Sequence, residues 1–420
     1  MKSDMERRLK LTIVSNYYYP DVASIANLYR QLAEYLAREM DVTVLCAVPS
    51  YLGAIPEAYR GRRYFCSREN GVRMIRIGVP AFDKTRKKQR IKSLFFYLLR
   101  AVGACRLLGK QDVILAVSQP PVFGGFIGWW LKKRTGGKFI YNIQDFNPEQ
   151  IECAGFSKSP LILKTLKAMD CFFCRAADSI ITVSEDMRKT LYARLNGTVP
   201  ENHVINNWVD TERIVGVPKA ANPLLKKYGL REQDFLVVYA GNIGIMQNLE
   251  TFLRAADMLK GRPDIRFVFI GAGARLSALR RLADELQLDN VLFAPYEPIE
   301  NIDLIYSLGD LEIVSIGKNV TKCGMPSKTW NILSCASPII CQVDPDSELN
   351  RLILSHKLGR TAPPGDAELL AKEILALYGD GPLRAEMGAN ARRLAVEAFD
   401  FKVSAARYRD VILALASPRA

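Results

Sequence analysis

Short apolar runs rich in β-branched residues alternate along this chain with longer stretches of helical periodicity. In the first half the apolar runs occupy residues 11–15, 42–46, 72–77, 113–117, 139–143, 179–183 and 203–205. The helical stretches between them include residues 24–38, 89–108, 161–176 and 185–195. Such alternation is typical of parallel sheets built from βαβ units. The sequence therefore predicts an α/β fold.

The pattern restarts after the segment Asn206–Asp210. A second set of strand-like runs occupies residues 235–240, 265–270, 291–294, 311–314 and 338–342. Helical patterns surround them at residues 248–260, 275–287, 299–308, 326–336, 366–379 and 383–398. We therefore expect two doubly wound, Rossmann-like domains, residues 1–210 and 211–398, facing each other across a cleft. Residues 399–420 are expected to form a helix that packs back toward the first domain. Open parallel sheets bind ligands at the carboxyl ends of their strands, so this cleft is the expected active site.

Charge is distributed unevenly between the two predicted domains. The 420 residues include 58 Lys and Arg and 44 Asp and Glu, a net charge of +14. Residues 1–200 contain 32 basic and 17 acidic residues, whereas residues 201–420 contain 26 and 27. A half this basic favours an anionic partner, which composition alone leaves open between nucleic acid, a membrane surface and an acidic ligand.

Other features of the sequence set the expected environment. The nine cysteines are scattered, which favours a reducing, cytoplasmic setting over a disulfide framework, and Cys171 and Cys174 are expected to be buried thiols. The charged N-terminal residues lead directly into a strand-like run, so we expect no signal peptide. Residues 113–131 are uncharged, but the Pro120-Pro121 and Gly124-Gly125 pairs divide them into a buried strand and a helix.

Two glycine turns follow consecutive strands of the second half. Tyr239-Ala240-Gly241-Asn242-Ile243-Gly244 leads from a strand toward a helix, and Gly271 and Gly273 repeat the arrangement one unit later. Glycines let a backbone approach a phosphate closely, and a helix N-terminus adds free N–H groups. Gln247 stands where a third glycine would complete the usual dinucleotide fingerprint. We therefore expect an anion-binding edge here, with ordinary strand-to-helix turns as the alternative.

A glycine–proline loop that leads into a helix is the second candidate. It reads Lys322-Cys323-Gly324-Met325-Pro326-Ser327-Lys328-Thr329-Trp330-Asn331, with Ser327 as the expected helix cap. A lysine in the first turn opposes the helix dipole, and an anionic ligand would account for Lys328. The alternative is an ordinary solvated lysine.

Carboxylates also lie at positions where acid–base or hydroxyl-binding roles are possible. Asp145 and Glu149 follow a buried strand and could serve in either role, or could simply cap a helix. The segment Asp344-Pro345-Asp346 has the spacing of a metal motif, but Ser347-Glu348 after it favours a turn and a helix cap. We therefore expect no metal.

Together these segments resemble glycosyltransferase family 4 of the GT-B fold, in the branch that builds bacterial O-antigen, capsule and colanic-acid-type polysaccharides. The resemblance covers residues 11–398, and its segments occur in the order of the family. They are residues 17–21 (YYYPD), 118–121 (SQPP), 144–149 (QDFNPE), 177–184 (ADSIITVS), 207–210 (NWVD), 239–244 (YAGNIG), 325–328 (MPSK) and 343–348 (VDPDSE).

The resemblance implies a retaining, metal-independent transfer of a sugar from a UDP- or GDP-linked donor to a lipid-linked saccharide acceptor, such as a polyprenyl diphosphate. The second domain would bind the donor, and the first the acceptor, near Tyr18, Pro20 and Asp21. The catalytic residues would be Asp145, Glu149 and Lys328, and no cofactor is implied. The expected donor-binding residues are Gly241, Asn242, Gly244, Gly271, Gly273, Tyr296, Lys322, Cys323, Gly324, Pro326, Ser327 and Asn331.

Four positions depart from the family pattern. Cys323 and Asn331 replace a pair of glutamates that flank the proline loop, and Asn242 and Gln247 replace an Arg and Lys phosphate clamp. Asn331 could still hydrogen-bond a hydroxyl group of the donor. We predict that Lys328, assisted by Lys322 and the backbone amides of Gly241–Gly244, replaces the clamp, because charge develops on the leaving diphosphate.

Basic residues followed by an apolar helix suggest contact with a membrane surface. The cluster comprises Lys84, Arg86, Lys87, Lys88 and Arg90, and Phe95 and Phe96 lie in the helix that follows. Residues 161–175 could form a second contact, although two domain-packing helices with basic outer faces remain the alternative. The pattern predicts peripheral association with the inner face of the cytoplasmic membrane, with cations on anionic headgroups.

Three other functions remain open from the sequence. A GT-B-fold UDP-sugar epimerase pairs two similar domains, but only His203 and His356 are available as histidine acid–base groups. A homologue that binds nucleotide-sugars without catalysis would account for the missing glutamates. A nucleic-acid-binding protein would account for the charge, but no helix-turn-helix, zinc finger or RNP-like motif is present, so we expect no nucleic-acid partner.

Overall fold

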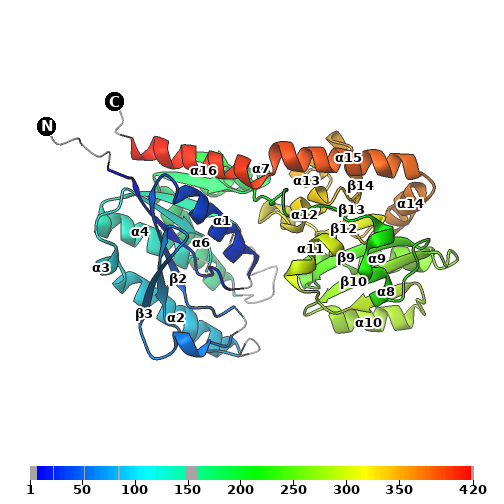
Figure 1. The fold of residues 1–420 in the computed structure, drawn as a ribbon, viewed down its shortest axis with the longest axis horizontal. Coiled ribbons are helices and arrows are strands. Elements are labelled where there is room, and N and C mark those ends of the chain that lie inside the picture. Colours follow the sequence, from blue (N-terminus) through cyan, green and yellow to red (C-terminus); the bar gives the residue numbers. More distant parts are fainter. Residues whose placement is uncertain are drawn as a thin grey trace. The chain divides into compact units, whose positions relative to one another are not determined.

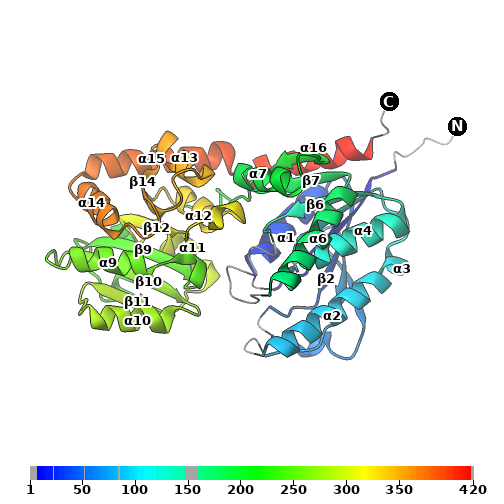
Figure 2. The same cartoon turned by 180° about the vertical axis from the view of Figure 1, so that it is seen from behind.

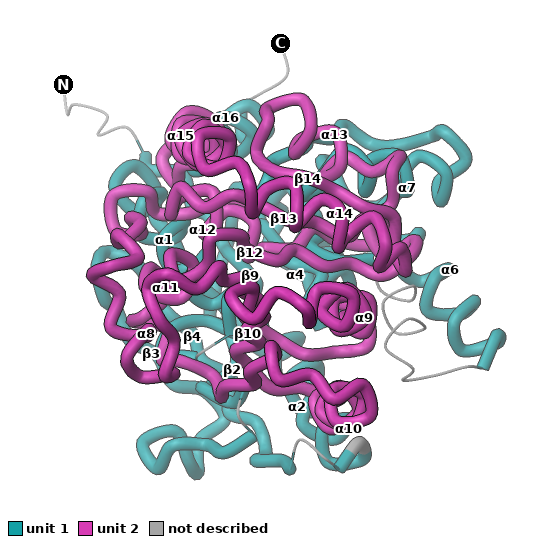
Figure 3. The backbone as a smooth tube through the Cα atoms, turned by 90° about the vertical axis from the view of Figure 1, so that its right-hand side faces the viewer, with its two compact units in different colours: residues 1–206, 405–420 teal, residues 207–404 magenta. Residues whose placement is uncertain are grey.

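The computed structural model describes residues 7–21, 23–51, 53–83, 86–120, 122–146 and 159–417, with the Lys87 side chain left out. These residues form two compact units (Figure 3). Unit 1 comprises the chain up to Asn206 together with residues from Ala405 onward, and unit 2 comprises Asn207–Ser404. The units are Rossmann-like α/β folds, each with one sheet between two layers of helices (Figures 1 and 2).

Unit 1 contains a predominantly parallel sheet in the order β3-β4-β2-β1-β5-β6-β7-β8. The strands are β1 (Lys10–Val14), β2 (Asp41–Ala47), β3 (Tyr64–Glu69), β4 (Val72–Ile77), β5 (Val113–Val117), β6 (Lys138–Ile143), β7 (Ser179–Thr182) and β8 (Glu201–Val204). Its helices are α1 (Ser24–Leu36), η1 (Glu57–Tyr59), α2 (Lys87–Gly103), α3 (Cys105–Leu108), α4 (Phe123–Thr135), α6 (Pro160–Ala176), α7 (Glu185–Arg194) and most of α16 (Phe401–Ala416).

Unit 2 contains a six-stranded parallel sheet in the order β11-β10-β9-β12-β13-β14. The strands are β9 (Phe235–Asn242), β10 (Ile265–Ala272), β11 (Val291–Ala294), β12 (Leu311–Ser315), β13 (Ile339–Gln342) and β14 (Gly359–Ala362). Its α-helices are α8 (Pro223–Lys227), α9 (Glu250–Met258), α10 (Leu276–Glu285), α11 (Ile302–Ile305), α12 (Lys328–Ser334), α13 (Glu348–Ser355), α14 (Ala367–Tyr378) and α15 (Gly381–Ala398). Short 3₁₀ turns are η2 (Lys219–Ala221), η3 (Ile245–Gln247), η4 (Ile299–Asn301) and η5 (Val320–Lys322).

The predicted α/β class is confirmed, and the reason is visible in the central strands. Every residue of β5 is buried, because helices cover both faces of the parallel sheet and leave no polar side. Helix starts follow local capping chemistry: Ser184 Oγ accepts a hydrogen bond from the Met187 amide at 3.1 Å, and acidic residues occupy the first turn of α7. Hydrophobic pattern and helix caps therefore both specify these elements of unit 1.

Strands β3 and β14 were absent from the sequence prediction. Strand β3 pairs antiparallel with β4 at the edge of its sheet and has four exposed residues, so it lacks an apolar signature. Strand β14 contains only four residues and begins with Gly359. Helix α13 follows Ser347, whose hydroxyl accepts a hydrogen bond from the Asn350 amide at 3.1 Å, which confirms the predicted cap.

The two faces of the unit 2 sheet have separate hydrophobic cores. Leu236, Val238 and Val314 point toward α8, α11, α12, α13 and α15. Val237, Tyr239 and Ile313, at alternate positions, point toward α9, α10 and α14. The indole of Trp330 in α12 stacks on Phe399 with ring centroids 4.1 Å apart, so the first core also anchors α12. This packing fixes the position of Lys328, which begins that helix.

In unit 1, α16 packs against the sheet through a buried polar network. Tyr408 and Asn142 are hydrogen-bonded, and Gln144 Nε2 lies 3.0 Å from Asn142 Oδ1 and 3.4 Å from the Tyr29 hydroxyl. All four side chains are buried. Because buried polar groups are stable only when they are paired, this network favours one position of α16 on the sheet.

A close approach of two strands in unit 2 gives a first prediction. Gly271 has φ +152°, and a Cβ atom there would lie 1.9 Å from the carbonyl oxygen of Gly241. We expect Gly271→Ala to reduce the free energy of unfolding by about 3 kcal/mol or more, because backbone cannot move aside as a flexible side chain can. Urea unfolding would measure this loss.

The matched control is Gly261→Ala, since a Cβ atom at Gly261 would meet nothing within 4 Å. We expect its free energy of unfolding to stay within about 0.5 kcal/mol of wild type. Equal stability of the two variants would contradict the inferred steric constraint.

Candidate active site

The predicted glycine turns lie side by side at the carboxyl edge of the unit 2 sheet. Gly241 is the penultimate residue of β9 and Gly271 the penultimate residue of β10, and the two pair in the parallel register. Both have positive φ values, +132° and +152°. In the strand order, β9 and β12 flank the position where the chain direction across the sheet reverses, which is where open α/β sheets bind ligands.

Lys328 reaches this edge from the first turn of α12. Its Nζ atom donates a hydrogen bond to the carbonyl oxygen of Ala240 at 2.6 Å and lies 3.5 Å from the centroid of the Tyr239 ring. A Cβ atom at Gly241 would come within 3.3 Å of the same Nζ atom. The structure therefore places together a lysine and a glycine that are 87 positions apart in the sequence.

The surroundings of Lys328 control its charge. Burial lowers the pKa of Lys328 from 10.5 to about 7, and the nearby carboxyl of Glu312 opposes this shift. Glu312 is completely buried in β12, and burial raises the pKa of its carboxyl well above the usual range. The amide of Gly309 donates to Glu312 Oε1 at 3.2 Å. Lys328 therefore gains or loses its charge near neutral pH, and an anion placed beside it would favour the charged form.

The remaining predicted residues of the β9 and β10 turns have mixed roles. The Gly244 amide donates to Gln247 Oε1 at 3.1 Å, so this amide is already paired with protein. Asn242 is exposed, and its carbonyl accepts the Tyr239 hydroxyl at 2.6 Å. Gly273 packs so closely that an added Cβ atom would lie 2.2 Å from the Ile243 carbonyl oxygen. Tyr296 is exposed, and its hydroxyl donates to the Ala272 carbonyl at 3.3 Å.

The residues of the proline loop and of the first turn of α12 lie in different environments. Lys322 is exposed, and its Nζ atom donates to Asn319 Oδ1 at 3.2 Å, whereas Cys323 is buried. Ser327 makes no side-chain capping hydrogen bond, so that expectation was wrong; its backbone has helical rather than extended torsion angles. Among the other predicted donor-binding residues, the half-buried ones are Gly324, Pro326 and Asn331.

The last residue of β13 positions this edge and was missed as a functional residue in the sequence. Gln342 is completely buried; its Nε2 atom donates to Asn248 O at 3.2 Å and to Ser315 Oγ at 3.1 Å, and its Oε1 atom accepts the Gly365 amide at 3.1 Å. It thereby links three loops. The available signal was a polar residue at the carboxyl end of an apolar strand.

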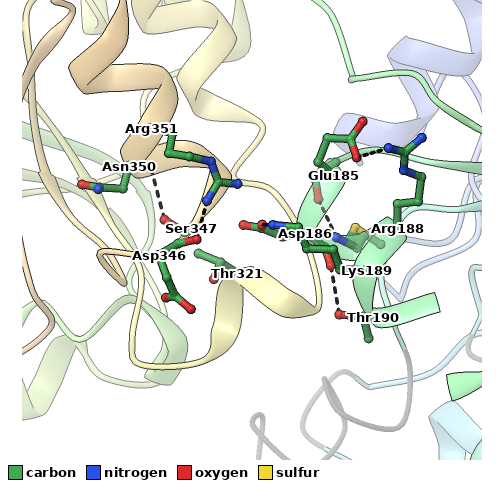
Figure 4. A network of polar contacts seen from close by, with 12 residues as sticks. Glu185, Asp186, Arg188, Lys189, Thr190, Thr321, Asp346, Ser347, Asn350 and Arg351 are labelled. Atoms are coloured by element: carbon green, nitrogen blue, oxygen red, sulfur yellow. Dashed lines mark hydrogen bonds and ion pairs between the residues drawn. The ribbon is translucent and has the colours of Figure 1, made fainter. Parts of the chain in front are cut away.

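Asp344 supports the segment that leads into the proline loop. Its Oδ2 atom accepts the Asn319 amide at 2.7 Å, just before η5. Figure 4 shows the neighbouring turn, where Ser347 caps α13 and Arg351 Nη1 donates to the Asp346 carbonyl at 2.5 Å. Within the described residues, no group of three or more His, Cys, Asp or Glu side chains could hold a metal ion.

In unit 1, Asp145 follows β6 and lies beside the loop after β5. Its Oδ2 atom accepts a hydrogen bond from Gln119 Nε2 at 2.9 Å, and the side chain is half-buried. Ser118 Oγ accepts the Gln144 amide at 3.1 Å and so ties the two loops together. The other predicted carboxylate, Glu149, lies outside the described residues. Asp145 thus presents a partly accessible carboxylate at the carboxyl edge of its sheet.

A buried ion pair supports this strand end and was also missed. Arg194 Nη1 lies 2.8 Å from Asp170 Oδ2, and the Tyr141 hydroxyl donates to Asp170 Oδ1 at 2.7 Å. The Arg194 guanidinium lies 4.5 Å from the centroid of the Phe146 ring, directly after Asp145. Removing one member would leave a buried charge uncompensated, so this cluster fixes the segment that carries Asp145.

The predicted acceptor residues occupy three different environments. Asp21 is buried, and its carboxylate accepts the amides of Ser50 at 2.9 Å and Tyr51 at 3.0 Å. Tyr18 is buried with the Arg76 guanidinium 5.8 Å from its ring centroid, whereas Pro20 is exposed. Asp21 therefore positions the loop after β2, and Pro20 is the predicted acceptor residue that solvent reaches.

Two further expectations from the sequence, the buried thiols and the divided apolar stretch, are confirmed. Cys171 and Cys174 are buried free thiols, as expected. Residues 113–131 divide into β5 and part of α4, as predicted from the sequence. No helix in the described part of the chain has both the length and the apolar character needed to cross a membrane.

Comparisons with known proteins agree with this architecture. The family described as "Glycosyl transferase 4-like domain" matches residues 24–208, and "Glycosyl transferases group 1" matches residues 222–394. WcaI of Escherichia coli (strain K12), a glycosyl transferase named for colanic acid biosynthesis, is 26% identical over 82% of this chain and 86% of its own length. WbjE of Pseudomonas aeruginosa, named as a glycosyltransferase, is 25% identical over 70% of this chain and 73% of its own length.

Solved structures with the same fold include glycosyl-transferring enzymes. Sucrose-phosphate synthase from Thermosynechococcus elongatus superposes with a TM-score of 0.77 and 17% identity over 97% of this chain and all of its own. HepE of Anabaena, solved with UDP, gives a TM-score of 0.71 and 14% identity over 97% of this chain and all of its own. The two Rossmann-like units thus form a GT-B fold. The chain belongs to glycosyltransferase family 4 and is a glycosyltransferase.

The shifted pKa of Lys328 gives a second prediction. Its folded-state pKa of about 7 lies below the ordinary value of 10.5. Between these values the unfolded chain binds more protons, so the free energy of unfolding rises with pH across this window. The Lys328→Met variant lacks this dependence. We therefore expect the variant to exceed wild type in unfolding free energy most strongly near pH 7, and the difference to shrink as the pH approaches about 10.

Urea unfolding of both proteins across this pH range measures the difference directly. Lys372→Met is the matched control, because Lys372 is exposed in α14 and its substitution should leave the pH dependence unchanged. A difference between Lys328→Met and wild type that stays constant with pH would contradict a Lys328 pKa near 7.

Proposed function

We propose that this glycosyltransferase transfers a sugar, with retention and without a metal, from a UDP- or GDP-linked donor to a lipid-linked saccharide acceptor in bacterial surface polysaccharide biosynthesis. It would act in the cytoplasm, bound peripherally to the inner face of the cytoplasmic membrane. Support for the polysaccharide role comes from the similarity to WcaI, whose name refers to colanic acid biosynthesis. Support for a nucleotide-sugar donor comes from HepE, which has the same fold and was solved with UDP and with UDP-glucose.

The observation that carries the proposal is the position of Lys328 beside Gly241, which pairs with Gly271. An ammonium group has three N–H donors, and the Ala240 carbonyl accepts one of them. The other donors are available for the oxygens of a diphosphate that approaches the glycine edge. When the bond between the sugar and the diphosphate breaks, negative charge accumulates on the leaving phosphate, and a preorganised cation stabilises that charge. Lys328 would thus replace the missing Arg and Lys clamp.

The protonation of Lys328 would accompany donor binding. Near pH 7 the free enzyme contains both forms of Lys328, because burial depresses its pKa. A diphosphate beside Nζ favours the charged ammonium, so donor binding raises the pKa and takes up protons. The cation is therefore formed where the substrate's own charge compensates it. Lys322, whose exposed Nζ contacts Asn319, would assist only if its side chain moves toward the phosphates.

Asp145 is the proposed acceptor-side group of unit 1. Its half-buried carboxylate is held by Gln119 and can accept a hydrogen bond from a sugar hydroxyl. Glu149 remains a prediction from the sequence. In place of the family's glutamate pair, Asn331 offers a neutral amide, and sugar recognition would depend on the backbone of Lys322–Gly324.

Turnover gives the third prediction. The donor would first be chosen by a thermal-shift screen of UDP, GDP, TDP and CMP sugars, because a ligand that binds the folded state raises the melting temperature. With that donor and a membrane lipid extract, we expect Lys328→Met to lower nucleoside diphosphate release by about 100-fold or more, since one electrostatic donor commonly contributes that much.

The control for turnover is again Lys372→Met, for which we expect wild-type activity. Activity of Lys328→Met within about threefold of wild type would contradict the role of this lysine in transition-state stabilisation. Donor binding without any transfer in the wild type would favour the non-catalytic alternative, and formation of an isomerised nucleotide-sugar would favour an epimerase.

The proposed membrane contact lies on the helices of unit 1. Helices α2 and α6 both pack against α4, so the three form one layer over the sheet. Ile91, Phe95 and Leu99 in α2 are 65%, 53% and 53% exposed and, at intervals of four residues, share one face of the helix. Leu161, Ile162 and Phe172 in α6 are also more than half exposed. An apolar layer of this kind fits insertion into the boundary between headgroups and acyl chains.

Basic residues flank this apolar face. Arg86, Lys88, Arg90 and Lys92 are exposed at the start of α2; Lys84 lies outside the described residues, and Lys87 is described only by its backbone. Phe96, predicted as a membrane residue, is half-buried, and the Arg100 guanidinium lies 5.2 Å from its ring centroid. Phe95 is therefore the better candidate of the two for contact with lipid.

Vesicle binding gives the fourth prediction. We expect the triple substitution Arg86→Gln, Lys88→Gln and Lys92→Gln to weaken binding to vesicles of phosphatidylglycerol by about 100-fold, because each cation near an anionic surface contributes about 1 kcal/mol. Sedimentation with vesicles measures the bound fraction. The matched control replaces three exposed cations of unit 2, Lys226, Arg254 and Lys372, by Gln. Equal loss in both triple variants would show a nonspecific charge effect and contradict a membrane face at α2.

A further inference from the structure

A basic cavity lies in unit 1 beside β3 and β4. Strands β2, β1 and β5 separate β4 from β6, the strand that precedes Asp145. The cavity has a volume of about 500 Å³. Four arginines contribute to its lining: Arg60, Arg62, Arg63 and Arg100. The rest of the lining contains no Asp or Glu and includes the apolar residues Ile55, Val79 and Pro80. The volume falls within the range of small-molecule sites, of about 300–1,000 Å³.

The arginines are positioned by the backbone around them. Arg60 Nε donates to the Ile55 carbonyl at 3.2 Å, and Arg100 Nη1 donates to the Gly78 carbonyl at 2.5 Å. A Cβ atom at Gly78 would lie 2.3 Å from the Arg62 carbonyl oxygen, so a glycine is required where the segment after β4 passes the arginine loop. The cavity is therefore formed by η1 and the loop before β3, by the segment after β4, and by α2. The Tyr64 hydroxyl, at the start of β3, donates a 2.8 Å hydrogen bond to the Arg100 carbonyl and so joins β3 to α2.

The charges of these arginines are not balanced by carboxylates. Across the described residues, none of the four guanidiniums takes part in an ion pair, although many other arginines of the chain do. Arginine stays protonated at any physiological pH, so four positive charges surround one cavity and repel each other. An anionic ligand would remove this repulsion, and planar guanidiniums match the oxygens of phosphate in pairs.

The location of the cavity indicates what kind of anion would bind. Arg100 lies on α2 next to Leu99, the last residue of the exposed apolar row Ile91, Phe95 and Leu99. A ligand with its anionic group in the cavity could therefore extend an apolar chain along α2 or into a bilayer that contacts it. A nucleotide or a polysaccharide has no apolar portion that would use this neighbouring surface.

We propose that this cavity, lined by Arg60, Arg62, Arg63 and Arg100, binds the diphosphate group of the lipid-linked acceptor. This inference deepens the proposed function and depends on it for the acceptor. The shared chemistry is a diphosphate, which could come from a lipid headgroup or from free pyrophosphate. The cavity would hold the acceptor by a group that does not react and would leave its sugar end free for transfer.

Calorimetric titration tests the site with three probes: farnesyl diphosphate, inorganic pyrophosphate and farnesol. We expect farnesyl diphosphate to bind the wild type, and Arg62→Gln with Arg63→Gln to weaken this affinity at least about tenfold, because each lost charge-assisted hydrogen bond is costly. These two side chains are exposed, so the double variant should fold normally, which circular dichroism would verify. The variant Arg62→Lys with Arg63→Lys keeps the charge, and its affinity for farnesyl diphosphate should lie between those of wild type and the Gln double variant.

The matched control is Arg68→Gln with Lys133→Gln, two exposed cations of unit 1 outside the cavity lining. It removes the same charge and should bind farnesyl diphosphate within about twofold of wild type. Tighter binding of farnesyl diphosphate than of pyrophosphate supports a lipid source, and equal binding supports a site for the diphosphate alone. Unchanged affinity of the arginine variant, an equal loss in the control, or farnesol binding as tightly as farnesyl diphosphate would overturn the proposal.

Failure of this proposal is distinguishable from failure of the proposed function. If nucleotide-sugars stabilise the protein and are turned over, but the arginine variant binds farnesyl diphosphate as tightly as wild type does, the glycosyltransferase function stands and the cavity assignment is wrong. If the arginine cavity binds farnesyl diphosphate but no nucleotide-sugar binds or reacts, the donor assignment is wrong and the anion site stands.

Discussion

The parallel pairing of β9 with β10 is the constraint on which the candidate site of unit 2 depends. It aligns Gly241 with Gly271 at one edge of the sheet, and both backbones there adopt conformations that side chains disfavour. The resulting close approach opens a position above the strand ends for the Lys328 ammonium. The buried stacking of Trp330 on Phe399 then holds α12, and with it this lysine, in place. The stability of unit 2 and the proposed role of Lys328 thus depend on one set of contacts.

Much of the fold follows from the sequence because both faces of each sheet are covered. Central strands such as β5 must be apolar throughout, which makes them visible in the sequence. An edge strand need not be apolar throughout, as the exposed residues of β3 show. The short β14, with a glycine at its start, carries too little hydrophobic pattern to be recognised. Prediction therefore worked where burial is complete and failed where solvent reaches the chain.

The site was predictable in its members but not in its geometry. The family-like motifs identified Lys328 and Gly241, yet only the fold shows that the Lys328 Nζ atom donates to the carbonyl of Ala240, directly before Gly241. Ser327 had the right residue type for a cap, but its backbone conformation excluded that role. Gln342 and Arg194 carry no motif, because their importance comes from which loops and rings they touch. Polar contacts between residues far apart in the chain produce no periodic pattern in a single sequence.

The buried contact between Tyr408 and Asn142 has a consequence for how the protein is made. These residues belong to the same compact unit, but the whole of unit 2 separates them in the chain. During synthesis, the ribosome delivers residues 207–404 as one continuous segment before Tyr408 emerges. Unit 2 can therefore fold as soon as it is complete, whereas unit 1 must keep part of its sheet uncovered until the final helix arrives. Unit 1 is thus begun first and finished last.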